Sequence, residues 1–387
     1  MMPCPPPEYV VYYAMRKEYH SNIRKQGLHS ERNWNSFMQF FNIISKKWIA
    51  ALLACCLLIS LCSCGLGQQK VSRSGFYFDT IITITLYGTS NEGYIDQCFE
   101  LAKEYERKFS NTIETSEISK INQNAGKFVE VSPETIELIK AGILYGELSD
   151  GSFDITIGNL SDLWNFSEIA ANLESEDNEA DASVIPDKDA ILKTVTHVDY
   201  TTIEINGNKV RLNDRKSKLD LGGIAKGYIA DRMRDYLNEQ QVTSGIINLG
   251  GNVLTIGPKA DGSNYNVGIQ KPFAPTGTSI GTISVKDASI VSSGVYERYY
   301  RVNDKLYHHI LDTSTGYPIE NDLYQVTIIN NCSMDGDALS TTCFALGLTD
   351  GMALVESLDG VEAVFVTSDE AIHCSSGIGD SITFQAE

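Results

Sequence analysis

Residues 219–228 read Leu-Asp-Leu-Gly-Gly-Ile-Ala-Lys-Gly-Tyr and constrain the fold more than any other stretch. An apolar run passes through two glycines into a helix that we expect over 224–237. Glycines let the backbone approach a ligand closely, and the free N–H groups of a helix start attract phosphate. Asp220 and Lys226 flank this turn with a carboxylate and an ammonium. The pattern therefore predicts either a plain structural turn or a phosphate-binding loop, although it lacks the Lys-Ser/Thr ending of a Walker loop.

The other predicted elements favour an α+β fold of one large domain, because strands and helices do not alternate regularly enough for a doubly wound sheet. An acidic stretch, 167–189, contains few large apolar residues and predicts an exposed loop. The remaining elements are strands at 80–87, 245–302 and 363–384, a hairpin at 198–212 turning at 206–208, helices at 92–109 and 132–148, and a helix at 338–358 broken near 347–351.

The N-terminal 63 residues are typical of a targeting segment. Lys46 and Lys47 precede an apolar run, 48–61, that is too short to span a membrane comfortably and fits a signal-peptide core. A small residue, Ser63, directly precedes Cys64, as in a bacterial lipobox, so Cys64 is the predicted lipidation site; an uncleaved anchor is the alternative. Met38 would give a leader of ordinary length and is the expected translation start. We therefore expect a leader over 1–63, a tether over 64–74 and the folded domain over 75–387.

Charge excludes one class of partner. Residues 1–63 carry 7 of the 31 Lys and Arg and 3 of the 50 Asp and Glu, so the remainder has a net charge of −23. Nucleic-acid binding needs basic patches, and such a chain is not expected to bind nucleic acid. Phosphates could still bind through a divalent cation. Beyond Cys64 lie four cysteines at 98, 332, 343 and 374, which lack zinc-like spacing and are expected to be buried thiols rather than disulfides.

Two pairs of residues near the C-terminus could carry chemistry. Asp337 and Thr341 lie four residues apart at the start of an apolar run, so a helix would place a carboxylate and a hydroxyl on one face. The alternative is that Asp337 merely caps that helix. His309 and Asp312 form a His-x-x-Asp pair, in which a carboxylate could orient an imidazole and hold it as a base.

Five segments in order resemble the ApbE family, the FAD:protein FMN transferases, from about Gly75 to the C-terminus. The resemblance implies an ApbE/T-fold-like single domain of mixed, mainly antiparallel sheets with flanking helices. It also implies Mg²⁺-dependent transfer of FMN from the substrate FAD to a Thr or Ser hydroxyl of an acceptor protein, with release of AMP. The segments are 152–158 (Ser-Phe-Asp-Ile-Thr-Ile-Gly), 219–228, 247–252 (Ile-Asn-Leu-Gly-Gly-Asn), 309–318 (His-Ile-Leu-Asp-Thr-Ser-Thr-Gly-Tyr-Pro) and 337–341 (Asp-Ala-Leu-Ser-Thr).

The resemblance assigns roles to residues of this chain. It implies that Asp337, Thr341 and the backbone carbonyl of Gly223 bind Mg²⁺, with Ser340 near the metal, and it places His309 at the phosphate end of the site. Thr112 departs from the family, where an aromatic is more usual, and cannot stack on a flavin ring. The positions that match flavin-nucleotide contacts are Phe78, Thr112, Ser152, Phe153, Asp154, Asp220, Lys226 and Ile310.

The acceptors implied by the resemblance are flavoproteins with a Ser/Thr-Gly-Ala-Ser/Thr-like motif, in membrane redox complexes of quinone-reductase or Rnf type. The expected location is the outer face of a bacterial cytoplasmic membrane, held by the lipid anchor. Three alternatives stay open: an FAD pyrophosphatase that uses water in place of the acceptor, a non-catalytic flavin-binding lipoprotein, and a solute-binding lipoprotein. The sequence does not decide whether His309 or a nearby Asp takes the hydroxyl proton.

Overall fold

The computed structural model describes residues 69–173, 178–379 and 382–386, and Cys64 and the leader lie outside them. An eight-stranded sheet forms the centre of the fold, and every neighbouring pair of its strands is antiparallel. In spatial order its strands are β1 (Lys70–Tyr77), β2 (Thr80–Tyr87), β6 (Gly245–Leu249), β7 (Asn252–Ile256), β10 (Ser289–Gly294), β13 (Leu323–Asn330), β14 (Glu362–Thr367) and β15 (Ile372–Cys374).

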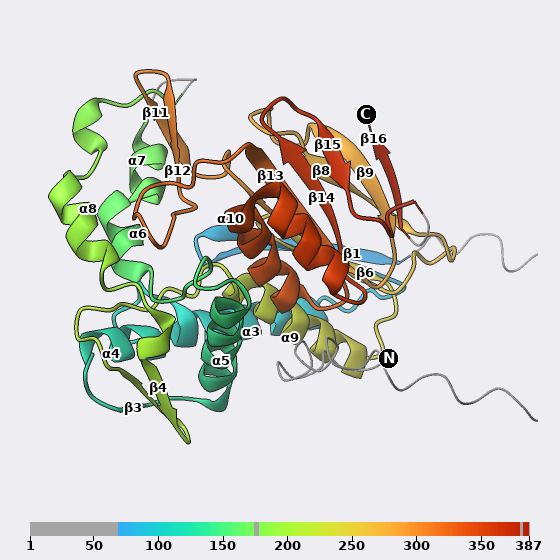
Figure 1. Ribbon diagram of the computed structural model, residues 1–387. Helices are drawn as coiled ribbons and strands as arrows, with labels where there is room; N and C mark the ends of the chain where they lie inside the picture. The colour runs from blue at the N-terminus through green and yellow to red at the C-terminus, as the bar shows by residue number, and fades with distance from the viewer. Residues whose placement is uncertain (1–68, 174–177, 380–381, 387) are drawn as a thin grey trace, which may run out of the picture. The chain divides into compact units, whose positions relative to one another are not determined.

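The two faces of this sheet belong to different hydrophobic clusters. In β14, Ala363 and Phe365 face the main core, whereas Val364 and Val366 face a second cluster. This period of two is what a strand buried on both faces requires. Helices α9 (Ala225–Glu239) and α10 (Ser333–Ser357) cover the first face. A three-stranded sheet of β16 (Thr383–Ala386), β9 (Ser279–Val285) and β8 (Tyr265–Gln270) covers the second, and both layers are visible in Figure 1.

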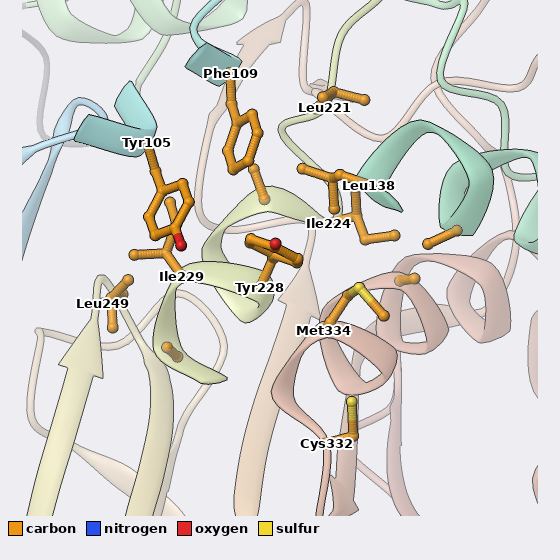
Figure 2. Close-up of a cluster of buried hydrophobic side chains, with 14 of the residues drawn as sticks. Tyr105, Phe109, Leu138, Leu221, Ile224, Tyr228, Ile229, Leu249, Cys332 and Met334 are labelled. Carbon is orange, nitrogen blue, oxygen red and sulfur yellow. The ribbon is translucent and has the colours of Figure 1, made fainter. Parts of the chain in front are cut away.

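Tyr228 on α9 holds the helical side of the core together. Its ring meets Tyr105 and Phe109 of α3 (Gly93–Phe109) edge-on, with centroids 5.6 Å away in both cases. Figure 2 shows this ring between the α3 aromatics and Met334 of α10. The other elements on this side are α4 (Glu117–Gln123), α5 (Pro133–Leu148), β3 (Val129–Glu130), and the hairpin β4 (Ile203–Asn206) and β5 (Lys209–Leu212).

A third cluster joins segments that are far apart in the chain. The stacked rings of Trp164, Phe166 and Tyr300 link helices α6 and α7 to strand β11. Figure 1 shows these green helices beside the orange hairpin of β11 and β12. The elements of this cluster are α6 (Gly158–Trp164), α7 (Phe166–Asn172), η1 (Ala182–Val184), α8 (Lys188–Val195), β11 (Tyr299–Val302) and β12 (Lys305–His308). The short helix η2 (Tyr200–Thr202) instead packs its Tyr200 ring against Gly146 of α5.

The stretch 167–189 was expected to be an exposed loop; its described residues are indeed exposed or partly exposed, but they are not a loop. Helix α7 occupies its start, and Ala180 N–H donates to the Arg301 carbonyl at 2.8 Å. Glu179 pairs with Arg301 in a short bridge, so the acidic segment extends the β11–β12 sheet. Its composition concealed this because the partner strand lies more than a hundred residues later.

Most locally signalled elements are confirmed. The predicted strand 80–87, the helices near 92–109 and 132–148, and the hairpin turn at Gly207 all form. The last helix is interrupted at Gly347, where φ is +79°. The tether expected over 64–74 is too long, because β1 already begins at Lys70 and pairs along its full length with β2.

The cysteine prediction holds in part. Cys98 and Cys343 are buried free thiols. The free thiol of Cys374 is exposed and corrects the expectation of burial, and Cys332 is disulfide-bonded and corrects the expectation of a thiol. Among the described helices, α10 alone is long and apolar enough to cross a membrane. Its residues Phe344 and Leu339 are fully packed in the main core, which is the usual state of a central helix in a folded domain.

Asp231 of α9 fixes the start of α10. Its two carboxylate oxygens accept the N–H groups of Ser333 (3.0 Å) and Met334 (2.9 Å), and Arg234 pairs with it at 2.8 Å. The residue before α10, Cys332, supplies no side-chain cap. A carboxylate from a neighbouring helix thus satisfies N–H groups that a helix start leaves without intrahelical partners.

We expect Asp231→Ala to lower the free energy of unfolding by roughly 3–5 kcal/mol, because it leaves a buried guanidinium and two buried N–H groups without their partner. Urea denaturation measures the loss. The matched control is Asp235→Ala one turn later, whose ion pair with Arg232 (3.2 Å) is partly exposed and should be worth about 1 kcal/mol or less. Equal losses in the two variants would contradict this role.

Candidate active site

Asp337 lies at the centre of the candidate site. Helix α10 begins at Ser333, so Asp337 is one turn inside the helix and the alternative of a helix cap is wrong. The side chain is 5% exposed, yet no hydrogen bond from its own helix start satisfies it. Instead one carboxylate oxygen accepts the Gly227 N–H at 2.9 Å, and the other lies 3.3 Å from the Lys226 ammonium.

Gly227 makes this contact possible. A Cβ at this position would lie 2.1 Å from the Ser333 carbonyl oxygen and 2.7 Å from the Met334 Cα. No side chain fits in that space, so only glycine lets the first turn of α9 reach the first turn of α10. Two helix starts thereby converge on one carboxylate.

The Gly222–Gly223 loop is held by several elements. Asn122 pairs with both the N–H (2.7 Å) and the carbonyl (3.0 Å) of Leu219. The Asp220 N–H donates to the Ile155 carbonyl at 2.8 Å, which brings the 152–158 segment alongside the loop. These bonds align the chain just before the glycines and fix where the loop turns.

Side chains close the loop on itself. The Asp220 carboxylate accepts the Gly222 N–H at 2.8 Å, and the Lys226 ammonium donates to the Gly222 carbonyl at 3.0 Å. On Gly223 a Cβ would lie 3.1 Å from the Phe153 ring and 3.9 Å from the Thr341 hydroxyl. The loop, the 152–158 segment and α10 therefore meet at Gly223.

Hydroxyl groups surround the second predicted metal ligand. The Ser293 hydroxyl, at the end of β10, lies 3.0 Å from the Thr341 hydroxyl and 2.8 Å from that of Ser340. Ser340 is fully buried and donates to the Asp337 carbonyl at 2.9 Å. Thr341 is partly exposed, whereas Ser340 already has protein partners.

The donor set fits a hard divalent cation. Asp337 offers a carboxylate and Thr341 a hydroxyl, and Gly223, whose backbone carbonyl is the third predicted ligand, lies close to that hydroxyl. Oxygen ligands of this kind suit Mg²⁺, which keeps waters and substrate phosphates in its shell. Over the described ranges no group of three or more His, Cys, Asp or Glu side chains could hold a metal, so a cation at Asp337 would need neutral oxygen ligands as well.

The two adjacent histidines differ in their surroundings. His308 is buried, its Nδ1 accepts the Ile310 N–H (3.3 Å), and its Nε2 therefore donates to the Ile319 carbonyl (3.0 Å). Burial lowers the pKa of His308 to about 4. His309 has a buried Nδ1 without a hydrogen-bond partner in the described chain, and burial together with the nearby charge of Arg298 lowers its pKa to about 3. Both imidazoles are neutral at pH 7, and only His309 has a free ring nitrogen.

The Asp312 side chain stabilises the turn that it begins, 312–315. Its carboxylate accepts the N–H groups of Ser314 (2.7 Å) and Thr315 (3.1 Å) and the Ser314 hydroxyl (2.6 Å). In the part of the chain described, no hydrogen bond links it to His309. The same turn contacts the residue just before the 152–158 segment, because the Thr313 hydroxyl donates to the Gly151 carbonyl at 2.7 Å.

Other residues matched to flavin contacts have structural partners. Asp154 is buried and accepts the N–H groups of Thr156 (2.7 Å) and Tyr200 (2.8 Å). Ile310 is buried in the main core. Ser152 lies in the turn that follows α5, where its N–H donates to the Ser149 carbonyl (3.1 Å).

Phe78 and Thr112 lie near α3. The Phe78 N–H donates to the Glu106 carboxylate at 2.7 Å, and the exposed Thr112 bonds the Ser110 hydroxyl at 3.0 Å. Among the described residues no hydrogen bond or ion pair joins either of them to Asp337. Their flavin contacts therefore stay predictions.

The sequence reading missed Ser293 and Glu297. Both lie on β10 or the turn after it, a segment that carries no recognisable motif. Desolvation raises the pKa of Glu297 to about 7, opposed by Lys226 and Arg298 and reinforced by Asp337. The carboxyl is on the exposed surface of the turn, so water moderates this effect. These influences place Glu297 within electrostatic reach of the Lys226–Asp337 pair.

Fold and site together define a class: an α+β domain in which a diglycine loop, two helix starts and one buried carboxylate converge. The chain belongs to the ApbE family, whose model matches residues 78–365. A protein named FAD:protein FMN transferase from Klebsiella pneumoniae is 36% identical over 311 residues, covering 80% of this chain and 93% of the relative. One of the same name from Treponema pallidum is 30% identical over 358 residues, covering 87% and 95%. The crystal structure of the ApbE protein from Thermotoga maritima matches with a TM-score of 0.71 and 33% identity, covering 80% of this chain and 97% of that one.

Because His308 is buried in its neutral form, we expect the protein to lose stability in acid. Because folding lowers the pKa of His308 from 6.5 to about 4, the unfolded chain binds a proton between those values that the folded chain does not. The free energy of unfolding should therefore fall as the pH drops from about 6.5 to about 4, by roughly 3 kcal/mol for a shift of this size. Urea denaturation across this range should show a shallower pH dependence for His308→Gln than for the parent. The exposed residue His373, changed to Gln, is the control and should keep the parental slope; the same slope in His308→Gln would refute the assignment.

Proposed function

We propose that this chain is a Mg²⁺-dependent FAD:protein FMN transferase. The observation that carries the proposal is the Asp337 carboxylate, buried between two helix starts beside the Gly222–Gly223 loop and Lys226. A buried carboxylate close to a hydroxyl and to backbone oxygens is better explained as a ligand for a cation than as a group that only stabilises the fold. Membership of the ApbE family and the names of its relatives support the same activity.

The residues of the site would act mainly by positioning and charge. Asp337, Thr341 and the Gly223 carbonyl would hold Mg²⁺, which would supply positive charge to the pyrophosphate of FAD. The Gly222–Gly223 loop and Lys226 would hold the phosphates next to it. In the reaction the hydroxyl oxygen of an acceptor Thr or Ser bonds to the FMN phosphorus of FAD, the pyrophosphate P–O bond breaks, and AMP leaves. Phosphoryl transfer of this kind depends more on alignment than on covalent help from the protein.

Two groups can receive the hydroxyl proton. His309 is neutral and has a free ring nitrogen, but a pKa of about 3 makes it a weak base. Desolvation raises the pKa of Glu297, although water on its exposed side moderates the effect, so this carboxylate is a stronger base than His309. We therefore assign His309 to contact with the phosphate end of the substrate and Glu297 to proton acceptance. Asp312 would fix the loop that carries His309.

Product analysis tests the function. The full chain is incubated with FAD, Mg²⁺ and an acceptor domain that carries a Ser/Thr-Gly-Ala-Ser/Thr-like motif. Mass spectrometry should show FMN on the acceptor hydroxyl, with one AMP released per FMN transferred. Free FMN and AMP without acceptor labelling would indicate a pyrophosphatase, and unchanged FAD would indicate a flavin-binding protein; both outcomes overturn the proposal.

Asp337→Asn should reduce FMN transfer by roughly 100-fold or more, because it removes the carboxylate among the three proposed cation ligands while its amide oxygen can still accept the Gly227 N–H. The rate is measured across a Mg²⁺ titration, with folding checked by thermal melt. Asp350→Asn, on the exposed end of α10, is the control and should leave the rate unchanged. Near-normal turnover of folded Asp337→Asn would remove the metal site from the mechanism.

We also propose that the chain is anchored by lipid at Cys64 on the outer face of a bacterial cytoplasmic membrane, because Ser63 is the small residue that lipoprotein processing requires. Cys64→Ala should release the protein from membranes on carbonate washing. Cys62→Ala is the control and should stay attached. Full retention of Cys64→Ala would contradict the anchor.

A further inference from the structure

Three hydroxyl groups and one carbonyl form a chain beside Asp337. Ser340 donates to the Asp337 carbonyl at 2.9 Å, Ser293 lies 2.8 Å from Ser340, and Thr341 lies 3.0 Å from Ser293. Ser293 enters from the end of β10, whereas the other two hydroxyls belong to α10.

Only one arrangement of protons satisfies all three contacts. A hydroxyl has a single proton, and a carbonyl can only accept. Since Ser340 gives its proton to the Asp337 carbonyl, the contact between Ser340 and Ser293 needs the proton of Ser293. Ser293 then has none left for Thr341, so Thr341 must donate to Ser293.

This direction has a consequence for Thr341. Its proton is committed to Ser293, and no described residue donates to the lone pairs of its oxygen. A hydroxyl that ligates a cation has to present a lone pair and to place its proton elsewhere. Groups that accept hydrogen bonds from metal ligands commonly orient them and tune metal affinity.

We propose that Ser293 and Ser340 are positioning residues that fix the Thr341 hydroxyl as a cation acceptor, and that Ser340 is not itself a ligand. The proposal rests on the metal site of the proposed function and assigns the ligand among the three hydroxyls. Ser340 is 0% exposed, and its hydroxyl already makes two contacts with protein, whereas Thr341 is partly exposed and adjoins Gly223.

Divalent binding without substrate tests the proposal. Mg²⁺ alone is titrated into the full chain by calorimetry, and Mn²⁺ alone by electron paramagnetic resonance. Ser293→Ala should weaken binding roughly 10- to 100-fold with little change in melting temperature, because Thr341 loses its proton acceptor. Ser293→Thr keeps the hydroxyl and should restore most of the affinity.

The matched control is Ser292→Ala. This neighbouring serine on β10 bonds Thr327 at 2.8 Å instead, so the variant loses an equivalent hydroxyl and should bind Mg²⁺ like the parent. Ser340→Ala should weaken binding less than Ser293→Ala, because Ser293 can still accept from Thr341.

The results of these titrations distinguish a failure of the Ser293 and Ser340 assignment from a failure of the proposed function. Parental affinity in Ser293→Ala would overturn it, and so would a larger loss in Ser340→Ala than in Ser293→Ala, which would make Ser340 a direct ligand. In both cases FMN transfer by the parent chain would still stand. Failure of the parent to bind either cation would instead overturn the metal site of the proposed function together with this assignment.

Discussion

The close approach of two helix starts at Gly227 is the constraint on which the site depends. A single methyl group there would lie 2.1 Å from the Ser333 carbonyl oxygen, so α9 and α10 would have to separate. The Asp337 carboxylate would then lose its N–H partner and its fixed distance to Lys226. Asp231 secures the same junction from the other side, because it binds the first N–H groups of α10. Packing of Tyr228 against α3 sets the position of α9 in turn. One glycine thus couples the hydrophobic core to the placement of the buried Asp337 carboxylate.

Short-range sequence patterns were sufficient to predict many of the strands, helices and turns of this fold. The strand at 80–87, the Ser132 helix start and the Gly207 turn depend on neighbours within a few residues, and all form as expected. The α+β class also followed from the order of elements. The acidic segment was misread because its order comes from Arg301, a partner far along the chain. Pairing with a distant strand of this kind produces no regular pattern of apolar and polar residues in the segment itself.

The site was predictable to the extent that its residues lie in motifs. Asp337, Lys226 and Gly223 were singled out from the sequence, and the structure brings them together. Ser293 could not be found in this way, because its partner Thr341 is 48 residues away and a lone serine on a strand carries no signal. Asp312 shows the opposite case: its spacing from His309 suggested a pair, but a nearer set of N–H groups in its own turn accounts for its carboxylate.

The charges of the proposed cation ligands also affect how a chain with a net charge of −19 could bind a pyrophosphate. A divalent cation held by one carboxylate and neutral oxygens keeps an excess positive charge, whereas a second carboxylate would cancel it. The excess positive charge would offset the repulsion between the two phosphate groups and the carboxylates of an acidic protein. That repulsion is strong at short range where water is excluded. A threonine hydroxyl whose proton is already committed supplies an oxygen ligand without adding negative charge. In the proposed cation site, the hydroxyl chain from Thr341 to the backbone carbonyl of Asp337 would therefore let this acidic protein complete the ligand set and still leave positive charge for the phosphates.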